Sequence, residues 1–361
     1  MQHWIDEPEA LRARLDAWQG QARVGLDTEF IRERTFYPQL ALVQLSVPGE
    51  VLLVDPLAEG VAAALRPLLQ DAGVQKIMHS ASEDLQALLR GCGIVPTPVF
   101  DTQVAAAMAG MGAGLGYQKL VEQVTGVALE KGETRSDWLR RPLSDSQLKY
   151  AADDVLHLHE LHAELDAKLR ALGRLDWLQA DSERALQVAA GDADDPMPHL
   201  SLRSAQTLDA TGQARVRRLL RWRDAEARRS DRPKGWVLDN ELAVQLSRRP
   251  FENFHAFNAL LDANPKAPRR ARKELFEMLA QPLDEEERNL PLNRAGEAID
   301  KQRLRAMQEA VAALASSLEL PEGLLCARRH LEALLEGRGW PDALQGWRRS
   351  LLEPALAPLL P

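Results

Sequence analysis

The first half of the chain alternates strand-like and helix-like runs, and this order restricts the possible folds more than any other feature. Residues 23–30, 40–47 and 51–55 are predicted as consecutive strands, because these β-rich runs are joined by short polar connections that suit hairpins. The next predicted elements are a helix over 57–70, a strand over 74–79, a helix over 82–90 and an extended piece over 98–101. Antiparallel strands followed by strand–helix units predict an α/β domain with a mixed sheet covered by helices on both faces.

The second half of the chain has no clear strand signal after about Gly173. Residues 191–198 are small, acidic and proline-containing, which is typical of a linker. Two leucine-patterned helical blocks follow, and each has a Pro-x-Gly turn ahead of a helix, at Pro233 and Pro321. We therefore expect an α/β domain over residues 1–190, a linker over 191–201, and two all-α helical domains over 202–283 and 290–361.

The composition is that of a globular chain with two or three domains. The 361 residues are 45% apolar and 27% charged, and no apolar run reaches the roughly 20 residues that a membrane helix needs. Residues 1–20 are predicted to form an amphipathic helix rather than a signal peptide, since they contain acids and arginines. The two cysteines, Cys92 and Cys326, are too few for a disulfide framework. We expect a cytoplasmic protein with no membrane partner.

Charge is unevenly distributed along the chain. The net charge is −8, but residues 207–283 carry 16 Lys and Arg against 10 Asp and Glu. Within this range, residues 215–229 hold seven arginines and Trp222 in one predicted helix. Arginines on one side of a helix can follow the phosphates of RNA, or they can form a solvated face balanced by Asp224 and Glu226. Both interpretations stay open at this point.

Two carboxylates lie close together in the first predicted strand. Asp27 and Glu29 are two residues apart, so their side chains leave the same face of the strand. The run is otherwise apolar, and two neighbouring carboxylates in a buried strand repel each other unless a cation lies between them. The alternative is that Glu29 ends the strand and faces water.

Three further residues are candidates to complete an acidic site. Tyr150 and Asp154 lie four apart in a long helix predicted over 144–169, so they share a face one turn apart. Asp84 is near the start of the helix over 82–90, where a carboxylate also stabilises the helix dipole. Each of these features alone is common in helices that bind nothing.

The order of these motifs resembles the DEDD exonuclease superfamily, in its subtype with a catalytic tyrosine. Members have Asp-x-Glu on the first strand, an Asp early in a later helix, and Tyr-x-x-x-Asp on a final helix, matched here by Asp27, Glu29, Asp84, Tyr150 and Asp154. The surrounding sequence at 100–103, 136–143 and 150–155 is similar to the ribonuclease D family, and the likeness extends over the whole chain. The two helical blocks resemble the HRDC domains of that family, the second less closely, which favours RNA binding by the arginine-rich helix. The resemblance implies a ribonuclease H-like exonuclease fold for the first domain.

The resemblance also implies hydrolysis assisted by two divalent cations. Oxygen ligands without a His or Cys cluster suit Mg²⁺ or Mn²⁺, and two such ions about 3.5–4 Å apart activate water and neutralise the leaving oxygen. Asp27 would bridge both ions, and Glu29 and Asp154 would complete the site that activates water. Asp84 would hold the second ion, directly or through water. Tyr150 would orient the attacking water, since a phenol with an ordinary pKa of about 10 is neutral near pH 7.

Five residues near the motifs are predicted substrate contacts, and several have a plain structural alternative. They are the main chain of Thr28 and the side chains of Phe30, His79, Lys131 and Trp138. His79 could instead satisfy the core, Lys131 could lie in a solvated loop, and Trp138 could pack inside the domain. Asp101 is expected either to support the site or to cap the helix that begins at Thr102.

The implied function is 3′→5′ exoribonuclease activity on RNA with a free 3′ end. The resemblance implies trimming of transfer-RNA precursors and other small structured RNAs, with release of nucleoside 5′-monophosphates by a monomer. Two alternatives stay open: a proofreading-type DNA exonuclease built on the same acids, and an RNA-binding adaptor without catalysis. The adaptor is disfavoured because all five motif residues are present.

Overall fold

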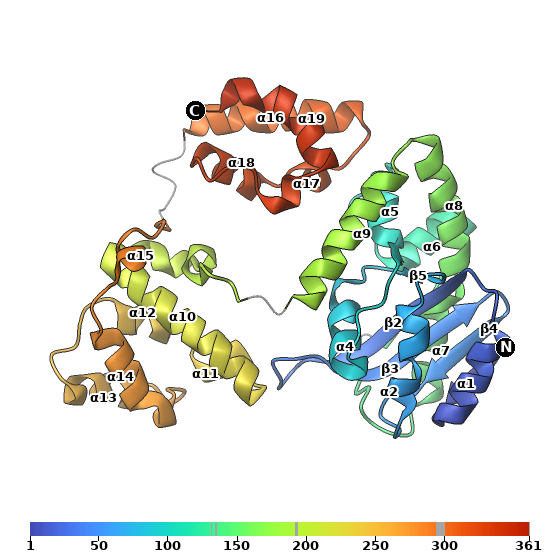
Figure 1. The fold of residues 1–361 in the computed structure, drawn as a ribbon, viewed down its shortest axis with the longest axis horizontal. Helices are drawn as coiled ribbons and strands as arrows, with labels where there is room; N and C mark the ends of the chain where they lie inside the picture. The colour runs from blue at the N-terminus through green and yellow to red at the C-terminus, as the bar shows by residue number, and fades with distance from the viewer. Residues whose placement is uncertain (131, 134–135, 192–193, 294–299, 361) are drawn as a thin grey trace. The chain divides into compact units, whose positions relative to one another are not determined.

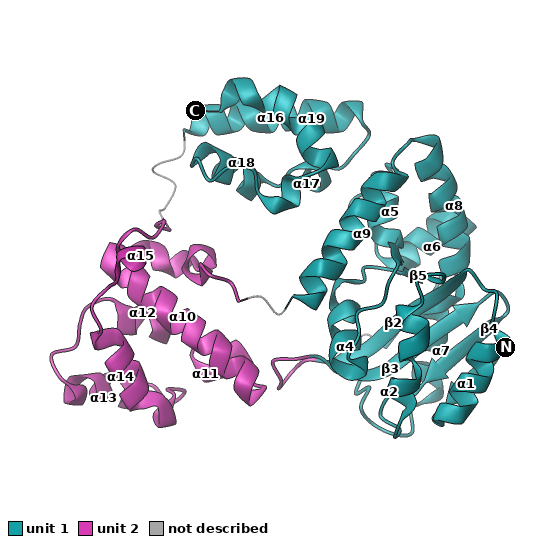
Figure 2. Ribbon diagram, viewed as in Figure 1, with its two compact units in different colours: residues 1–31, 38–191, 299–361 teal, residues 32–37, 192–298 magenta. Residues whose placement is uncertain are grey.

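The computed structural model describes residues 1–130, 132–133, 136–191, 194–293 and 300–360. The described residues group into two units (Figure 2). Unit 1 contains Met1–Ile31, Pro38–Gly191 and Ile299–Pro361, and unit 2 contains Arg32–Tyr37 and Asp192–Ala298. The C-terminal helices therefore belong to the same unit as the sheet, while the domain boundaries expected from the sequence stay a prediction.

Six strands form one mixed sheet in unit 1 (Figure 1). They are β1 (Gln2–Ile5), β2 (Arg23–Ile31), β3 (Gln39–Val47), β4 (Glu50–Val54), β5 (Gln75–Met78) and β6 (Val99–Asp101). Their spatial order is β1-β4-β3-β2-β5-β6. The pairs β2–β3 and β3–β4 are antiparallel, whereas β1–β4, β2–β5 and β5–β6 are parallel. The mixed sheet predicted from the sequence is confirmed.

Helices pack on both faces of this sheet. One buried cluster gathers residues of α1 (Pro8–Ala17), α2 (Val61–Ala64), α3 (Arg66–Gln70) and α4 (Ser82–Cys92). The cluster on the other face gathers residues of α5 (Thr102–Met108), α6 (Tyr117–Thr125), α7 (Asp145–Leu156) and α8 (Leu158–Ala171). Helix α9 (Leu175–Ala190) contributes to both clusters. The sheet is thus the middle layer of three.

The remaining helices form two further apolar clusters. Unit 1 also holds α16 (Lys301–Ser317), α17 (Glu322–Leu325), α18 (Arg328–Leu335) and α19 (Trp347–Leu356). Unit 2 is built from α10 (Ala210–Ser230), α11 (Lys234–Val237), α12 (Asn240–Ser247), α13 (Phe254–Asp262), α14 (Arg272–Ala280) and α15 (Glu285–Arg288). Among the described residues, every helix is too short or too polar to cross a lipid bilayer.

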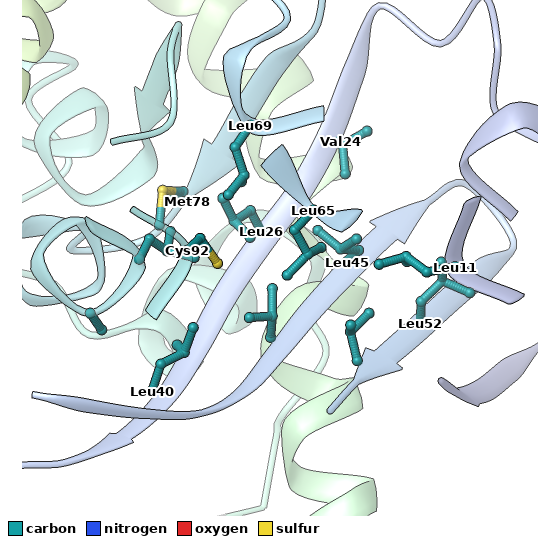
Figure 3. Close-up of a cluster of buried hydrophobic side chains, with 14 of the residues drawn as sticks. Leu11, Val24, Leu26, Leu40, Leu45, Leu52, Leu65, Leu69, Met78 and Cys92 are labelled. Carbon is teal, nitrogen blue, oxygen red and sulfur yellow. The ribbon is translucent and has the colours of Figure 1, made fainter. Parts of the chain in front are cut away.

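Strand alternation separates apolar from acidic residues on β2. Leu26 points to the cluster that also contains Leu45 from β3 and Leu65 and Leu69 from the α2–α3 region (Figure 3). Because successive side chains of a strand point to opposite faces, Asp27 lies on the other face, which α7 and α8 cover. Burial of the leucines therefore fixes which face of β2 carries the acids.

Three predicted elements were wrong in detail. The helix expected over 1–20 begins at Pro8, because Gln2–Ile5 forms β1 and pairs in parallel with β4. The helix expected over 57–70 starts after Gly60, whose φ of 79° is left-handed, and divides at Leu65. The long helix expected over 144–169 divides at His157, whose ψ of 3° ends α7, and α8 begins at the next residue.

Unit 2 includes the connection between β2 and β3. The backbone N–H groups of Phe36 and Tyr37 donate to Oδ1 of Asp231, both at 3.0 Å. Asp231 follows α10 in a left-handed conformation, with a φ of 46°. The cationic groups of Arg228 and Lys234 lie 5.4 Å and 5.7 Å from the centre of the Phe36 ring. Segment Arg32–Tyr37 is therefore held by polar and cation–π contacts at the end of α10.

Candidate active site

Asp27 and Glu29 share one face of β2, near the point where the strand leaves the sheet. Asp27 pairs with Gln44 of β3 and Glu29 pairs with Leu42, and the register shifts between Glu29 and Phe30. An irregularity of this kind twists a strand and re-aims the side chains beside it. Both acids are partly buried under the helical layer. The predicted alternative, in which Glu29 ends the strand and faces water, does not describe this structure.

Tyr150 and Asp154 come from α7, which has a strong start signal. Ser144 and Gln147 form a capping box, in which each side chain accepts a hydrogen bond from the backbone of the other residue. One turn into the helix, the hydroxyl of Tyr150 and the carboxylate of Asp154 lie close enough that each shifts the pKa of the other. The i,i+4 spacing read from the sequence thus brings these two side chains together.

Asp84 lies in the first turn of α4 and is only 8% exposed. Its Oδ1 accepts a hydrogen bond of 2.5 Å from the hydroxyl of Thr28 on β2. This bond joins the strand that carries Asp27 to the helix that carries Asp84. The side chain of Thr28 therefore has a structural partner, which leaves its main chain as the predicted substrate contact.

The four acids form one electrostatic cluster. Burial raises the pKa of Asp27 well above its ordinary value, and the charges of Asp84, Asp154 and Glu29 raise it further. Burial, followed by the charges of Asp154 and Asp84, raises the pKa of Glu29 to about 9. Burial also raises the pKa of Asp84 to about 7 and that of Asp154 to about 7. The ionised forms of these carboxylates therefore destabilise one another in the absence of a cation.

The donor set fits a hard divalent cation. Carboxylate oxygens are the ligands that Mg²⁺ and Mn²⁺ prefer, and a cation would offset the crowded negative charge. Within the described ranges, no group of three or more His, Cys, Asp or Glu side chains is already arranged to hold a metal ion. Asp84 instead accepts a hydrogen bond from the hydroxyl of Thr28.

Tyr150 is held as a neutral phenol beside the acids. Burial, and next the charge of Asp154 and that of Glu29, raise the pKa of its hydroxyl above the ordinary value. Gly132 lies against its ring, since a Cβ built on Gly132 would come within 1.8 Å of the Tyr150 Cδ2 atom. Trp138 is a second neighbour, with 6.1 Å between the two ring centres. The ring is therefore closely enclosed while its hydroxyl faces Asp154.

Trp138 and His79 have internal partners. Trp138 is 2% exposed and belongs to the core, which favours packing over base stacking. The His79 ring nitrogens lie 2.8 Å from the hydroxyl of Thr102 and 3.0 Å from the carbonyl oxygen of Leu115. These contacts favour a core role for His79, and its substrate contact stays a prediction.

The remaining predicted residues are placed as follows. Phe30 is partly buried and packs against the apolar cluster around Leu26. Asp101 caps α5, and its carboxylate also accepts hydrogen bonds from the backbone of Ser80 at 3.0 Å and Ala81 at 2.9 Å. Asp101 therefore fixes the turn that leads into α4. Lys131 lies outside the described residues.

Sequence reasoning missed two residues at this site. Gln44 is fully buried beside Asp27, and the signal for it in the sequence was a long polar side chain within a mostly apolar strand. Tyr117 donates its hydroxyl to the backbone oxygen of Asp153 and accepts from the backbone N–H of His157, both at 3.1 Å. It therefore braces the break between α7 and α8, and no local pattern announces that contact.

Known proteins resemble this chain both in its first domain and over its full length. A family model described as a 3′-5′ exonuclease matches residues 2–170. The chain is 52% identical to ribonuclease D of Xanthomonas oryzae pv. oryzae, over 100% of this chain and 99% of that protein. It is 35% identical to ribonuclease D of Pseudomonas paraeruginosa, over 98% of this chain and 96% of that protein.

A solved structure supports the same grouping. The crystal structure of Escherichia coli RNase D, described as an exoribonuclease involved in structured RNA processing, superposes with a TM-score of 0.86. It shares 29% sequence identity and covers 99% of this chain and 97% of its own. The likeness includes the helical C-terminal region as well as the sheet.

Proposed function

The chain belongs to the ribonuclease D family and is a 3′→5′ exoribonuclease, and from this premise we propose how its acids carry out the reaction. Exonucleases of this superfamily depend on divalent metal ions. We propose that Asp27, Glu29, Asp84 and Asp154 hold two such ions, Mg²⁺ or Mn²⁺. When bound, these ions lower the pKa of a water molecule and neutralise charge on the attacking and leaving oxygens.

Each acid has a proposed position relative to the cations. The charges of Asp84, Asp154 and Glu29 all raise the pKa of Asp27, so Asp27 is near all three acids and would contact both ions. Glu29 and Asp154 would complete the site on the water side, because the charge of Asp154 acts on Glu29 more strongly than that of Asp84. Asp84, on its separate helix, would hold the other ion.

Tyr150 would orient the attacking water. Its hydroxyl is neutral and lies within hydrogen-bonding reach of Asp154, so it can direct a water molecule without removing its proton. Attack of the water oxygen on the phosphorus of the last linkage forms a new P–O bond and breaks the P–O3′ bond, while the water loses a proton and the leaving 3′ oxygen takes one up from solvent. The released product is a nucleoside 5′-monophosphate, and the shortened chain keeps a free 3′-hydroxyl.

The proposed substrate is RNA with a free 3′ end, including transfer-RNA precursors and other small structured RNAs. The description of the E. coli relative as a structured-RNA exoribonuclease supports this choice. We also propose that the chain acts as a monomer. The observation that carries the catalytic proposal is the placement of four at least partly buried carboxylates from β2, α4 and α7 close enough that Asp84 and Asp154 raise the pKa values of Asp27 and Glu29, with Tyr150 beside them.

A digestion time course tests the function. RNA labelled at its 5′ end is incubated with the wild type and with Asp27→Ala, in Mn²⁺ and in EDTA. We expect stepwise shortening from the 3′ end in Mn²⁺ alone, and none with the variant. A DNA oligomer of matched sequence is the substrate control: faster digestion of the DNA would overturn the ribonuclease assignment. Complete absence of nucleotide release from unstructured RNA would instead support the RNA-binding adaptor.

A further inference from the structure

Unit 2 carries a groove between the end of α10, helix α11 and the chain that leads into α14. Its volume is about 940 Å³, and all of its lining residues lie between Trp222 and Glu274. The groove is therefore formed within unit 2 alone. It has no part in the acidic cluster described above.

An exposed indole lines this groove. The side chain of Trp236 is 51% exposed, which is unusual for so large an aromatic residue. A second indole, Trp222, is held in place because its Nε1 donates to Oε1 of Glu274 at 2.9 Å. Fixed aromatic faces on which bases can stack are a recurring feature of sites for single-stranded nucleic acids.

Unpaired cations surround the indoles. Arg232, Lys266, Arg269 and Arg270 line the groove and are exposed, and among the described residues none of them has a side-chain hydrogen bond or a close ion pair; the charges of Arg232 and Arg269 act on Glu226 and Asp262 only at longer range. The acids of the groove are already engaged, since Glu226 pairs with Arg229 at 2.7 Å and Glu274 accepts from Trp222. The free charge at this surface is therefore positive.

The arginine-rich helix offers less to a partner than its sequence indicates. Arg217 on α10 pairs with Glu286 at 2.6 Å and donates to the carbonyl of Pro196. Arg218 pairs with Glu287 and donates to three backbone carbonyls. These guanidinium groups fasten α10 to its own unit, whereas the groove keeps cations that have no such partner.

We propose that this groove binds single-stranded RNA, with Trp236 stacking on a base and Arg269 and Arg270 contacting phosphates. The site rests on the proposed function, because it would hold the same RNA that the acids shorten. Stacking tolerates any base, so the groove would add affinity without selecting sequence.

Binding to the full chain in EDTA tests the groove without hydrolysis. The probe is a fluorescent uridine oligomer of about 12 nucleotides, followed by anisotropy. Trp236→Ala should weaken binding at least about fivefold, and Trp236→Phe should retain most of the affinity because it keeps a ring. Arg269→Ala with Arg270→Ala should lower the slope of log affinity against log salt by about 1.4. The matched control is Arg248→Ala with Arg249→Ala, two exposed cations of unit 2 outside the groove, which should leave the slope unchanged.

One outcome contradicts the groove. If Trp236→Ala binds the oligomer as tightly as the wild type, the proposal is wrong. This holds even if the arginine variant binds more weakly, because the groove would then be a surface for any polyanion. Hydrolysis of a trinucleotide in Mn²⁺ separates this result from the catalytic proposal, because three nucleotides are enough to engage the acids but too few to occupy the groove as well. Trp236→Ala should hydrolyse it at the wild-type rate. If the wild type binds the oligomer as expected but does not hydrolyse the trinucleotide, the catalytic proposal is wrong. The binding result would still support the groove.

A separate observation concerns Gln44 at the catalytic strand. Its side chain is fully buried, and neither its amide nitrogen nor its amide oxygen has a hydrogen-bond partner among the described residues. Gln44 is the cross-strand neighbour of Asp27, so the two side chains leave the same face of the sheet. A buried amide without partners destabilises a fold, which makes an apolar residue the better choice on structural grounds alone.

We infer that Gln44 is a positioning residue, whose amide orients the Asp27 carboxylate towards bound cations. Gln44→Met keeps the length and apolar volume of the side chain but removes the amide. The thermal midpoint in EDTA should stay level or rise, while the Mn²⁺ concentration for half-maximal thermal shift should increase several-fold.

A buried hydroxyl on the same strand provides the control. Ser46 donates to the backbone oxygen of Val155 at 2.9 Å, so Ser46→Ala removes a satisfied group and should lower the midpoint equally with and without Mn²⁺. If Gln44→Met behaves like Ser46→Ala, or leaves the Mn²⁺ midpoint unchanged, Gln44 has only a structural role and the inference is wrong.

Discussion

At the scale of single residues, the acids of β2, α4 and α7 are poorly stabilised while the site holds no cation. Burial raises the pKa values of all four, and repulsion from the other acids raises those of Asp27 and Glu29 further. Keeping such a carboxylate ionised lowers the free energy of unfolding, and a bound cation raises it again. The cluster therefore couples metal binding to both stability and pH.

Stability should depend on pH in a direction set by these shifts. The pKa values of about 7 for Asp84 and Asp154 lie above the ordinary values of unfolded carboxyls. The folded chain therefore binds more protons than the unfolded chain between about pH 4 and pH 7, and this contribution to stability is lost as pH rises through about 7. Divalent cations displace those protons, so the thermal shift caused by Mn²⁺ should be larger near pH 8 than near pH 6. Equal shifts at both pH values, measured by thermal unfolding in EDTA and in Mn²⁺, would contradict this coupling.

Asp27→Asn should separate catalysis from stability. The amide keeps the shape but removes one charge from the cluster, so turnover should fall by at least about 10²–10³-fold. The thermal midpoint in EDTA should not fall, because the substitution also removes repulsion from Asp84 and Asp154. Asp153→Asn, on the same helix as Asp154, is the control and should alter turnover little. A variant of Asp27 that keeps wild-type turnover would exclude this residue from the metal site.

Tyr150→Phe should slow the chemical step and spare the metals. Loss of one oriented hydrogen bond to water corresponds to about tenfold to a hundredfold in kcat, at 1.36 kcal/mol for each factor of ten. The Mn²⁺ midpoint should stay the same, since the phenol is neutral and no ligand is removed. Gly132→Ala should act in the same direction, because its Cβ would displace the Tyr150 ring. An unchanged kcat in both variants, from single-turnover kinetics, would remove Tyr150 from the mechanism.

At the scale of elements, the sequence predicts what local periodicity controls. The i,i+2 spacing of Asp27 and Glu29 and the i,i+4 spacing of Tyr150 and Asp154 are properties of one strand and one helix, so they could be read directly. The bond from Thr28 to Asp84 spans 56 positions and depends on how α4 packs against β2. No local pattern contains that information.

The missed elements have similar causes. Gln2–Ile5 becomes a strand because β4 offers a free edge, which is a tertiary effect on a four-residue segment. Helical periodicity continues across His157, so the division of α7 from α8 could not be read from apolar spacing. The hydroxyl of Tyr117 that braces this division comes from a residue 40 positions away.

The attachment of the C-terminal helices within unit 1 gives a stability prediction. Arg348 of α19 donates two hydrogen bonds of 2.6 Å to the carboxylate of Asp181 on α9, and both residues are buried. The rings of Trp177 and Trp347 stack beside them, with 4.5 Å between centres. Asp181→Ala leaves a buried guanidinium unpaired and should cost about 3–5 kcal/mol in chemical denaturation.

A surface pair on the same helix is the matched control. Glu353 pairs with Arg349 at 3.0 Å, but both side chains are more than a third exposed. Glu353→Ala should therefore change the free energy of unfolding by less than about 1 kcal/mol. Equal losses for the two variants would mean that the buried pair adds nothing beyond an exposed one.

At the scale of the whole molecule, the acids and the RNA groove belong to different units. The acidic cluster lies in unit 1, and the groove with Trp236 lies in unit 2. Two units with separate cores are expected to unfold in more than one step. A ligand stabilises only the unit whose folded form binds it.

Calorimetry should therefore resolve the two units by their response to metal. We expect Mn²⁺ to raise the temperature of one transition and to leave the other in place. Asp27→Asn should abolish the shift without removing either transition. If Mn²⁺ moves both transitions together in the wild type, the units unfold as one cooperative body.

The segment Arg32–Tyr37 sets an order of events during translation. It emerges from the ribosome early, yet its hydrogen-bond partner Asp231 is 195 positions further along the chain. The strands on either side of it can pair as soon as they are made, because β2 and β3 are sequential neighbours in the sheet. In the nascent chain, β2 with Asp27 can thus pair with β3 before Asp231, the hydrogen-bond acceptor of Phe36, has been synthesised. Completion of unit 2 is consequently a late step of biosynthesis that depends on a piece made near its beginning.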